Sequence, residues 1–293
     1  KTPVVTSMIA IFVNILLNYT LIFGHFGAPA LGVTGAAIAT FTARIVEMAS
    51  IFIYVYGWKT ELAARFSEFF GYSSSLLKEY IRTSLPVIGN EFMWGLGVTM
   101  YSLAYGRMGD TAVAAITISQ TIQDMIMVFF QGVAAAATVI LGNELGAGRL
   151  KEAEEDASRL LWLQIAMSLL LAAFCILTRN LLVGIYDVSE TVFREAALCM
   201  VVYGLFLPFK MTNLVTIVGI LRSGGDTRFC LLLDSGSVWL IGVPLSFLGA
   251  LVLKLPIHLV FAMTLTEDAV KFFVAWWRYT RKKWLKNLAA GIR

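Results

Sequence analysis

Long apolar runs separated by short polar segments dominate this chain. Eight of the runs are long enough to cross the hydrocarbon core of a bilayer, which requires roughly 20 helical residues. The pattern therefore predicts an all-α integral membrane protein with eight transmembrane helices. The expected spans are residues 3–24, 32–57, 84–106, 111–142, 158–178, 195–221, 228–253 and 256–278.

The composition agrees with a membrane environment. Of the 293 residues, 58% are hydrophobic and 14% are charged, and the mean hydropathy is +0.78; about 25% of the residues of a soluble domain are charged. This composition makes the lipid bilayer the expected surrounding. The formal charge of +4 is small and gives no reason to expect a nucleic-acid partner. The cysteines lie inside apolar runs without paired spacing, which predicts neither disulfides nor a metal site: Cys175, Cys199 and Cys230.

The lysines and arginines outside the spans indicate an orientation. If the spans alternate in direction, sixteen of these residues fall on one side of the bilayer and four on the other. Because positively charged loops remain cytoplasmic, we expect a multi-pass protein of the cell (inner) membrane with both ends of this chain in the cytoplasm.

A short polar stretch joins the sixth and seventh runs. Its arginine suits the negative C-terminal pole of a helix, its two glycines permit a positive φ, and the following Asp or Thr can cap the next helix. The stretch therefore predicts a tight hinge between two spans. The hinge residues are Arg222, Gly224, Gly225, Asp226 and Thr227.

The sequence LRSGGDTRF at this hinge resembles the LR-x-x-GDT hinge that multidrug and toxic compound extrusion (MATE) transporters carry in each of their two six-helix lobes. Two further stretches match the family pattern. Residues 31–40 are rich in small side chains, which let helices approach closely in lipid, and the glycine-rich residues 142–149 precede an acidic helix start. The three matches lie in the family's order and together cover nearly the whole chain.

The resemblance implies a domain organisation. Residues 1–57 would be the last two helices of an N-terminal lobe, and residues 84–278 the complete C-terminal lobe of a twelve-helix inverted-V transporter. Residues 58–83 would form a cytoplasmic inter-lobe linker with an amphipathic helix, and residues 279–293 a basic cytoplasmic tail. The first four helices would then be missing by truncation or supplied by another chain, and the full-length protein is expected to be a monomer.

The resemblance also implies a function, namely secondary active multidrug efflux. Organic cations would be exported by sodium- or proton-coupled antiport with alternating access and without a cofactor. The alternative is a flippase for lipids or lipid-linked oligosaccharides of the same wider superfamily. Within the spans six acidic residues outnumber three basic ones, which favours the cation exporter. A membrane-embedded enzyme is disfavoured, because His25 and His258 have no paired ligand spacing and no catalytic motif is present.

Ionisable residues inside spans are costly and usually face a cavity or a partner. Glu91, beside Asn90, is the first candidate for cation coupling, because the family commonly carries an acidic residue on this helix. The structural alternative is an ion pair between Glu91 and Lys210. Lys210 follows Pro208, which is expected to kink the sixth span.

Other polar residues complete the candidate site. Gln120 and Asp124 share a face of the fourth span, where they line a wet cavity or serve a structural role, and Asp234 is a weaker candidate on the seventh span. The residues predicted to bind the coupling ion or the substrate are Glu91, Asn90, Asp124, Gln120, Lys210 and Asn213.

Two intramembrane charge pairs have the same spacing. Arg44 and Glu47 are three residues apart in the second span, and Asp268 and Lys271 are three apart in the eighth. Overlaying the two helices as an internal repeat aligns the pairs with their signs reversed. Either each helix satisfies its own pair, or the pairs exchange partners between lobes in one conformation.

Overall fold

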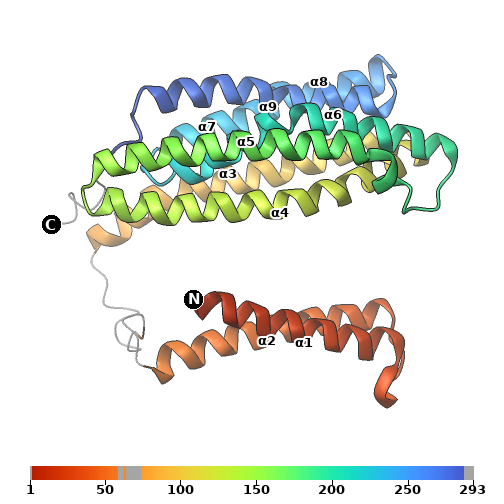
Figure 1. Ribbon diagram of the computed structural model, residues 1–293, viewed down its shortest axis with the longest axis horizontal. Coiled ribbons are helices and arrows are strands. Elements are labelled where there is room, and N and C mark those ends of the chain that lie inside the picture. Colours follow the sequence, from red (N-terminus) through yellow and green to blue (C-terminus); the bar gives the residue numbers. More distant parts are fainter. Residues whose placement is uncertain (1, 59–62, 64–73, 287–293) are drawn as a thin grey trace. The chain divides into compact units, whose positions relative to one another are not determined.

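The computed structural model describes residues 2–58, 63 and 74–286. All regular elements within these residues are helices (Figure 1). The helices form two compact units, Lys1–Leu77 and Lys78–Arg293, each of which is held by its own packing.

The first unit is a helical hairpin. Helix α1 (Thr2–Phe23) and helix α2 (Val33–Gly57) pack together and are joined through the short 3₁₀ helix η1 (His25–Gly27). The buried residues of α2 are Gly35, Ala39 and Ala43, which recur every four residues and so form one stripe. Because these side chains are small, the backbones approach closely, and a Cβ at position 35 would collide with the backbone of Leu21.

The second unit consists of six long helical rods that run side by side (Figure 1). The central rod contains α6, which packs against α4, α5 and α9. The rods are α3 (Ser74–Gly106); α4 (Asp110–Gly146); α5 (Leu150–Val183); α6 (Glu190–Leu214) with the π-helical η3 (Val215–Leu221); α7 (Thr227–Ser237) with η4 (Val238–Gly242), α8 (Val243–Phe247) and η5 (Leu248–Val252); and α9 (Ile257–Thr280).

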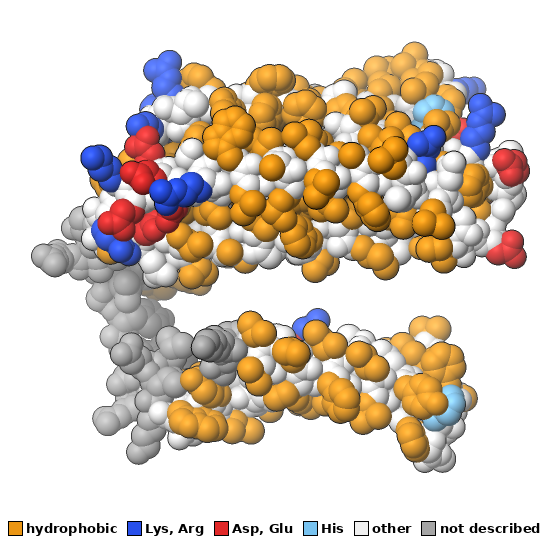
Figure 2. All heavy atoms as spheres, in the orientation of Figure 1, with side chains coloured by type: hydrophobic (Ala, Val, Ile, Leu, Met, Phe, Trp, Pro, Cys, Tyr) orange, Lys and Arg blue, Asp and Glu red, His pale blue; other side chains and the backbone are white. Residues whose placement is uncertain are grey.

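The predicted all-α membrane fold is confirmed. Two rods in the first unit and six in the second correspond to the eight expected spans, and six of the eight are long and apolar enough to cross a membrane by length and composition. The described parts of the other two, α3 and α9, are not among these six. In the second unit, charged side chains gather at the two ends of the rods, while apolar side chains cover the flank between them (Figure 2).

The helices extend beyond the apolar runs that predicted them. Helix α5 begins at Leu150 rather than at residue 158, because its charged first turns continue the helix outside the apolar layer. Helix α3 likewise begins at Ser74, so the last part of the expected linker is the start of this span. Residues 59–62 and 64–73 of that linker lie outside the described residues.

Pro208, where a kink is expected, lies inside helix α6, which continues to Leu214 and is followed by the π-helical η3. Two further π-helical segments, η4 and η5, interrupt the next rod. Segments of this kind are rare and frequently accompany functional sites. Here they lie in the two rods that the hinge connects.

Candidate functional site

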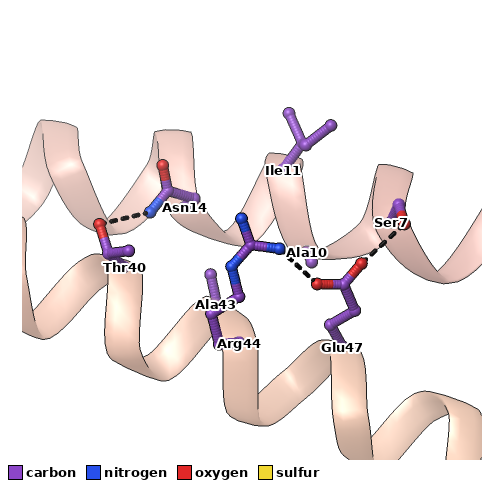
Figure 3. A pocket seen from close by; sticks show the side chains of 8 residues that line it. All are labelled: Ser7, Ala10, Ile11, Asn14, Thr40, Ala43, Arg44 and Glu47. Atoms are coloured by element: carbon purple, nitrogen blue, oxygen red, sulfur yellow. Dashed lines mark hydrogen bonds and ion pairs between the residues drawn. The ribbon is translucent and has the colours of Figure 1, made fainter. Parts of the chain in front are cut away.

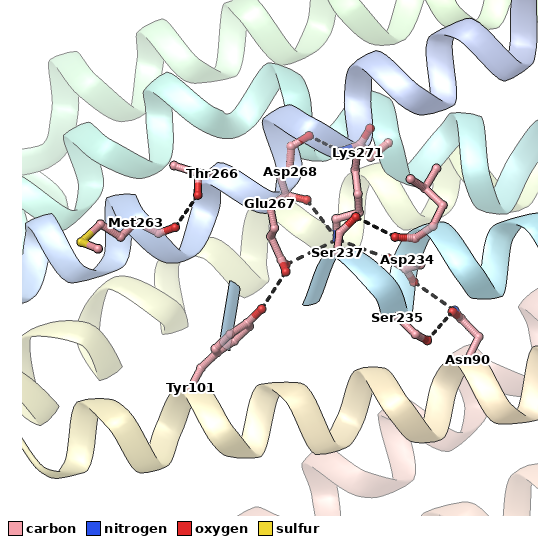
Figure 4. A network of polar contacts seen from close by, with 12 residues as sticks. Asn90, Tyr101, Asp234, Ser235, Ser237, Met263, Thr266, Glu267, Asp268 and Lys271 are labelled. Atoms are coloured by element: carbon pink, nitrogen blue, oxygen red, sulfur yellow. Dashed lines mark hydrogen bonds and ion pairs between the residues drawn. The ribbon is translucent and has the colours of Figure 1, made fainter. Parts of the chain in front are cut away.

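A buried lysine on α9 is surrounded by three carboxylates. Nζ of Lys271 lies 3.2 Å from Oδ1 of Asp234, 3.4 Å from Oε1 of Glu267 and 3.4 Å from Oδ1 of Asp268. Lys271 is only 5% exposed, and Glu267 and Asp268 are buried as well. We call these four residues the Lys271 cluster (Figure 4). The cluster thus contains three acidic groups and one basic group.

Helical spacing explains why these side chains meet. Glu267, Asp268 and Lys271 stand at i, i+1 and i+4 of α9, which places them on one side of the helix. Asp234 comes from α7, which packs against α9. The cluster thus joins two neighbouring rods of the second unit.

Helix α3 supplies hydrogen bonds to the remaining carboxylate oxygens (Figure 4). Nδ2 of Asn90 donates to Oδ2 of Asp234 over 2.9 Å, and Oγ of Ser235 donates to Oδ1 of Asn90 over 3.1 Å. The hydroxyl of Tyr101 donates to Oε2 of Glu267 over 2.7 Å. Asp234 and Glu267 therefore each accept bonds on both oxygens, which fixes their orientation.

A cavity of about 720 Å³ lies beside the cluster. Asp234, Asp268 and Lys271 form part of its wall, and Trp94 and Met127 contribute apolar surface from α3 and α4. Its volume falls in the range of about 300–1,000 Å³ that is usual for small-molecule sites. Buried charge thus borders a space large enough for an organic ligand.

Asn213, predicted for the site, also lines this cavity. Its Nδ2 donates to the backbone oxygen of Asp268 over 2.7 Å. The residue is 4% exposed, and its Oδ1 has no hydrogen-bond partner among the described residues. A buried amide oxygen without a partner is costly, so this atom is suited to accept a bond from a ligand.

Glu91 has a partner other than Lys210, the structural alternative that the sequence offered. Its carboxylate forms an ion pair with the hinge residue Arg222, with 2.9 Å between Oε1 and Nη1, and not with Lys210. The Glu91 side chain is 57% exposed, while that of Arg222 is 16% exposed. Both residues line the cavity, so the pair links the hinge to the cavity wall.

Lys210 lines the same cavity from α6. In the described part of the chain no carboxylate lies within ion-pair distance of its ammonium group, and Nζ is 6.0 Å from the centre of the Tyr203 ring. The structure therefore does not show the alternative in which Lys210 neutralises Glu91. Lys210 instead adds a positive charge to the cavity.

Gln120 and Asp124 are both exposed on α4. Neither is among the residues that line the cavity beside the Lys271 cluster. The structure thus brings together Asn90, Glu91, Lys210 and Asn213 of the predicted site but not these two.

The hinge is a tight turn whose residues act differently from the expectation. Gly225 has a φ of +76°, as expected, whereas Gly224 is required because a Cβ there would collide with the backbone of Trp284. No hydrogen bond from the Asp226 side chain caps α7. Both carboxylate oxygens of Asp226 instead accept bonds from the guanidinium of Arg278. Thr227 is the buried first residue of α7.

The segment after α9 folds back onto this hinge. Trp284 is completely buried, its ring stacks on that of Tyr279 with 5.9 Å between the centroids, and its Nε1 donates to the Tyr279 backbone oxygen. The expected basic tail therefore starts with a packed turn, at least as far as Lys286, the last described residue.

The charge pair of the first unit is also formed. Nη1 of Arg44 lies 2.7 Å from Oε2 of Glu47, and Oγ of Ser7 donates to Oε1 of Glu47 over 2.7 Å (Figure 3). These residues border a cavity of about 220 Å³ between α1 and α2. Each helix thus satisfies its own pair, and an exchange of partners between lobes remains a prediction.

Glu267 and Tyr101 were not assigned to a site by the sequence. The sequence does indicate Glu267, because it stands four residues before Lys271 and is a second acidic residue, after Asp268, on that face of the helix. The contact of Tyr101 with Glu267 joins α3 to α9, and no local pattern predicts such a long-range contact.

Helical rods with buried charges beside a cavity are typical of membrane transporters. The sequence model of the family described as MatE matches residues 86–248, more than half of the chain, so the protein belongs to this family of ion-coupled transporters. This finding confirms the family suggested by the hinge.

Individual relatives agree with the family assignment. The chain is 22% identical over 274 residues to the uncharacterized transporter YisQ of Bacillus subtilis (strain 168), covering 94% of this chain and 60% of YisQ. A MOP superfamily transporter from Pyrococcus furiosus, whose binding pocket of reverse polarity suggests a different function, has a similar fold, with a TM-score of 0.79 at 20% identity. The Vibrio cholerae MATE transporter VcmN in its bent form gives a TM-score of 0.75 at 18% identity. Both comparisons cover 96% of this chain and 62% of the solved chain.

Proposed function

We propose that the full-length protein exports amphipathic organic cations by sodium- or proton-coupled antiport. Substrate would bind in the cavity beside the Lys271 cluster and reach the two sides of the membrane in turn. The observation that carries this proposal is the surplus of carboxylates around one lysine at the wall of a cavity of about 720 Å³. A negative surplus in a medium of low dielectric constant attracts a cation strongly.

The rest of the cavity wall suits the same class of substrate. The Trp94 ring can make a cation–π contact with a substrate ammonium group, and the flexible Met127 side chain adapts to different apolar shapes. Together with Asp234 and Asp268, these residues offer an organic cation both an apolar surface and a counter-charge.

The hinge gives a route for alternating access. Arg222 connects the hinge to Glu91 at the cavity wall, so rocking of the lobes would alter the cavity through this ion pair. We also propose that the protein is a monomer of the inner membrane and that both ends of this chain are cytoplasmic, following the distribution of lysine and arginine.

A lipid or lipid-linked oligosaccharide flippase is the second candidate, and the lining of the cavity supports it. Lys210, Arg222 and Lys271 contribute as many basic side chains to the wall as Glu91, Asp234 and Asp268 contribute acidic ones. The ammonium group of Lys210 is available to a phosphate. The similar Pyrococcus furiosus fold, with its pocket of reverse polarity, is a further reason to test this function.

The proposal is tested with the full-length protein reconstituted in vesicles that contain a fluorescent organic cation. A proton gradient and a sodium gradient are imposed separately, on the wild type and on Glu91→Gln. Gradient-driven transport supports antiport, and its loss in Glu91→Gln places that residue on the transport route. Failure of the wild type to respond to either gradient contradicts the proposal.

Lys210→Gln separates the two candidate functions. If the substrate is a cation, removal of a positive charge from the cavity leaves transport intact or improves it. If the substrate carries phosphate, the same change reduces flipping of a labelled anionic lipid at least tenfold. Lys254→Gln, at an exposed lysine outside the cavity, is the matched control and is expected to change neither activity.

A further inference from the structure

The charged groups of the cavity wall, taken together with Glu267 of the Lys271 cluster, leave one negative charge without a counter-charge when every carboxylate is ionised. Glu91 and Arg222 form their own ion pair. The three carboxylates of the Lys271 cluster then face two ammonium groups, those of Lys271 within the cluster and of Lys210 on the same cavity wall. An uncompensated charge inside a membrane protein is costly, so a single additional positive charge would neutralise the group.

Two oxygen atoms beside the cavity are able to receive that charge. Oδ1 of Asp268 contacts Lys271, whereas its Oδ2 has no polar partner within the described residues. Oδ1 of Asn213 is buried and likewise unpartnered there. Both side chains line the cavity, and they are joined by the hydrogen bond from Asn213 to the Asp268 backbone oxygen.

We infer that the Lys271 cluster is the binding site for one coupling cation, a proton or a sodium ion, which is taken up from the cavity at Asp268 beside Asn213. Asp234 and Glu267 are held by Asn90 and Tyr101 as well as by Lys271, so Asp268 is the carboxylate with an oxygen left over. Lys271 is then a permanent internal counter-ion, and the coupling cation supplies the missing charge.

This site deepens the proposed antiport and rests on it. A cation at Asp268 removes the negative surplus that would attract an organic cation into the same cavity. The two ligands would therefore exclude each other, which is the requirement for exchange. The charged and titratable groups that surround the site come from five places. They are Glu91, Tyr101 and Tyr105 on α3, Asp124 on α4, Tyr203 and Lys210 on α6, Arg222 at the hinge, and Asp234 on α7.

Ion binding to the purified full-length protein tests the inference without any transport assay. Binding of radioactive sodium detects the sodium form, and proton uptake in weakly buffered solution detects the proton form. Asp268→Asn is expected to weaken the relevant binding at least tenfold. Asp187→Asn, an identical change at an exposed position that does not line the cavity, is expected to leave it unchanged. Ion binding by Asp268→Asn that equals the wild type overturns the inference.

The binding of a fluorescent organic cation is measured on the same samples. The site predicts that Asp268→Asn loses competition between the dye and the coupling ion. If the wild type binds the ion at Asp268 but moves no dye, the proposed substrate class is wrong and the ion site stands. If the wild type transports the dye and Asp268→Asn binds the ion normally, the site is wrong and the transport function stands.

A measurement on the wild type covers the case in which Asp268→Asn does not fold. A hydrophobic carbodiimide modifies protonated carboxyl groups in membrane proteins, and mass spectrometry locates the modified residue. We expect modification at Asp268 that increases as the pH falls and that sodium suppresses if sodium is the coupling ion. Absence of modification in the cluster from mildly acidic to mildly alkaline pH, together with no ion binding, contradicts the inference.

Discussion

Arg278 holds Asp226 through two parallel hydrogen bonds, 2.6 Å from Nε to Oδ2 and 2.9 Å from Nη2 to Oδ1. The two side chains are 17% and 11% exposed, and the Arg278 guanidinium also lies 4.5 Å from the centre of the Phe229 ring. This bidentate geometry is the strong form of an arginine–carboxylate contact. The pair therefore fastens the turn between the sixth and seventh rods to the end of the last helix.

Asp226→Ala is expected to destabilise the protein, because it leaves the largely buried guanidinium of Arg278 without its counter-charge. Loss of one partner of a buried pair costs about 3–5 kcal/mol, and we expect about 2–3 kcal/mol for this partly buried one. Thermal unfolding in detergent measures the effect. Glu152→Gln breaks the exposed pair with Arg149 and should change stability by less than about 1 kcal/mol; equal effects of the two variants would contradict the role given to Asp226.

Gly224→Ala is expected to loosen the hinge. The new methyl group would collide with the backbone of Trp284, so the segment after α9 must shift. Overpacking of this kind costs about 1–3 kcal/mol. Gly236→Ala on α7, where a Cβ meets nothing within 4 Å, is the control and should be neutral or stabilising. Thermal unfolding in detergent compares the two variants, and an unchanged midpoint for Gly224→Ala would contradict the close packing.

Tyr101→Phe removes the hydroxyl that donates to Glu267 and leaves the ring in place. A hydrogen bond to a charged group contributes about 1.5–3 kcal/mol, against about 1 kcal/mol for a neutral one. Tyr105→Phe, which loses a bond to Thr264 of 2.9 Å, is the matched neutral case on the same helix. We expect the larger loss of stability for Tyr101→Phe, and the reverse order would argue against an ionised Glu267.

Lys271→Gln leaves three carboxylates close together without their ammonium group. Their mutual repulsion is strongest when all three are ionised and falls as they take up protons. The variant is therefore expected to be most destabilised at alkaline pH and to approach the wild type as the pH is lowered. Unfolding midpoints measured over a pH series test this, with Lys254→Gln as an exposed control. A loss that does not depend on pH would mean that Lys271 acts mainly by packing.

Much of the fold was predictable because the bilayer requires long apolar helices. The eight runs predicted the eight rods, and the hinge sequence identified the family from a few residues. The ends of the rods were less predictable, because charged turns such as the start of α5 continue a helix beyond the apolar layer. The early start of α3 was obscured for the same reason, since its first turns read as a polar linker.

The candidate site was predicted less completely, because it depends on contacts between distant helices. Lys271 was paired with Asp268 from their spacing, but the contribution of Asp234 required knowledge that α7 packs beside α9. Glu91 had the right helix and the right charge, yet its partner Arg222 lies at the hinge, more than a hundred residues away in sequence. Local spacing describes one face of one helix and gives no information about the helix opposite.

The burial of Trp284 against Gly224 has a practical consequence for handling the protein. A truncation that removes this indole would leave a hole beneath the turn between two membrane helices, and the Tyr279 ring would lose its stacking partner. An affinity tag or fluorescent fusion should therefore follow Trp284 at a distance. A deletion that reaches back to Trp284 is therefore expected to lower the stability of the protein in detergent.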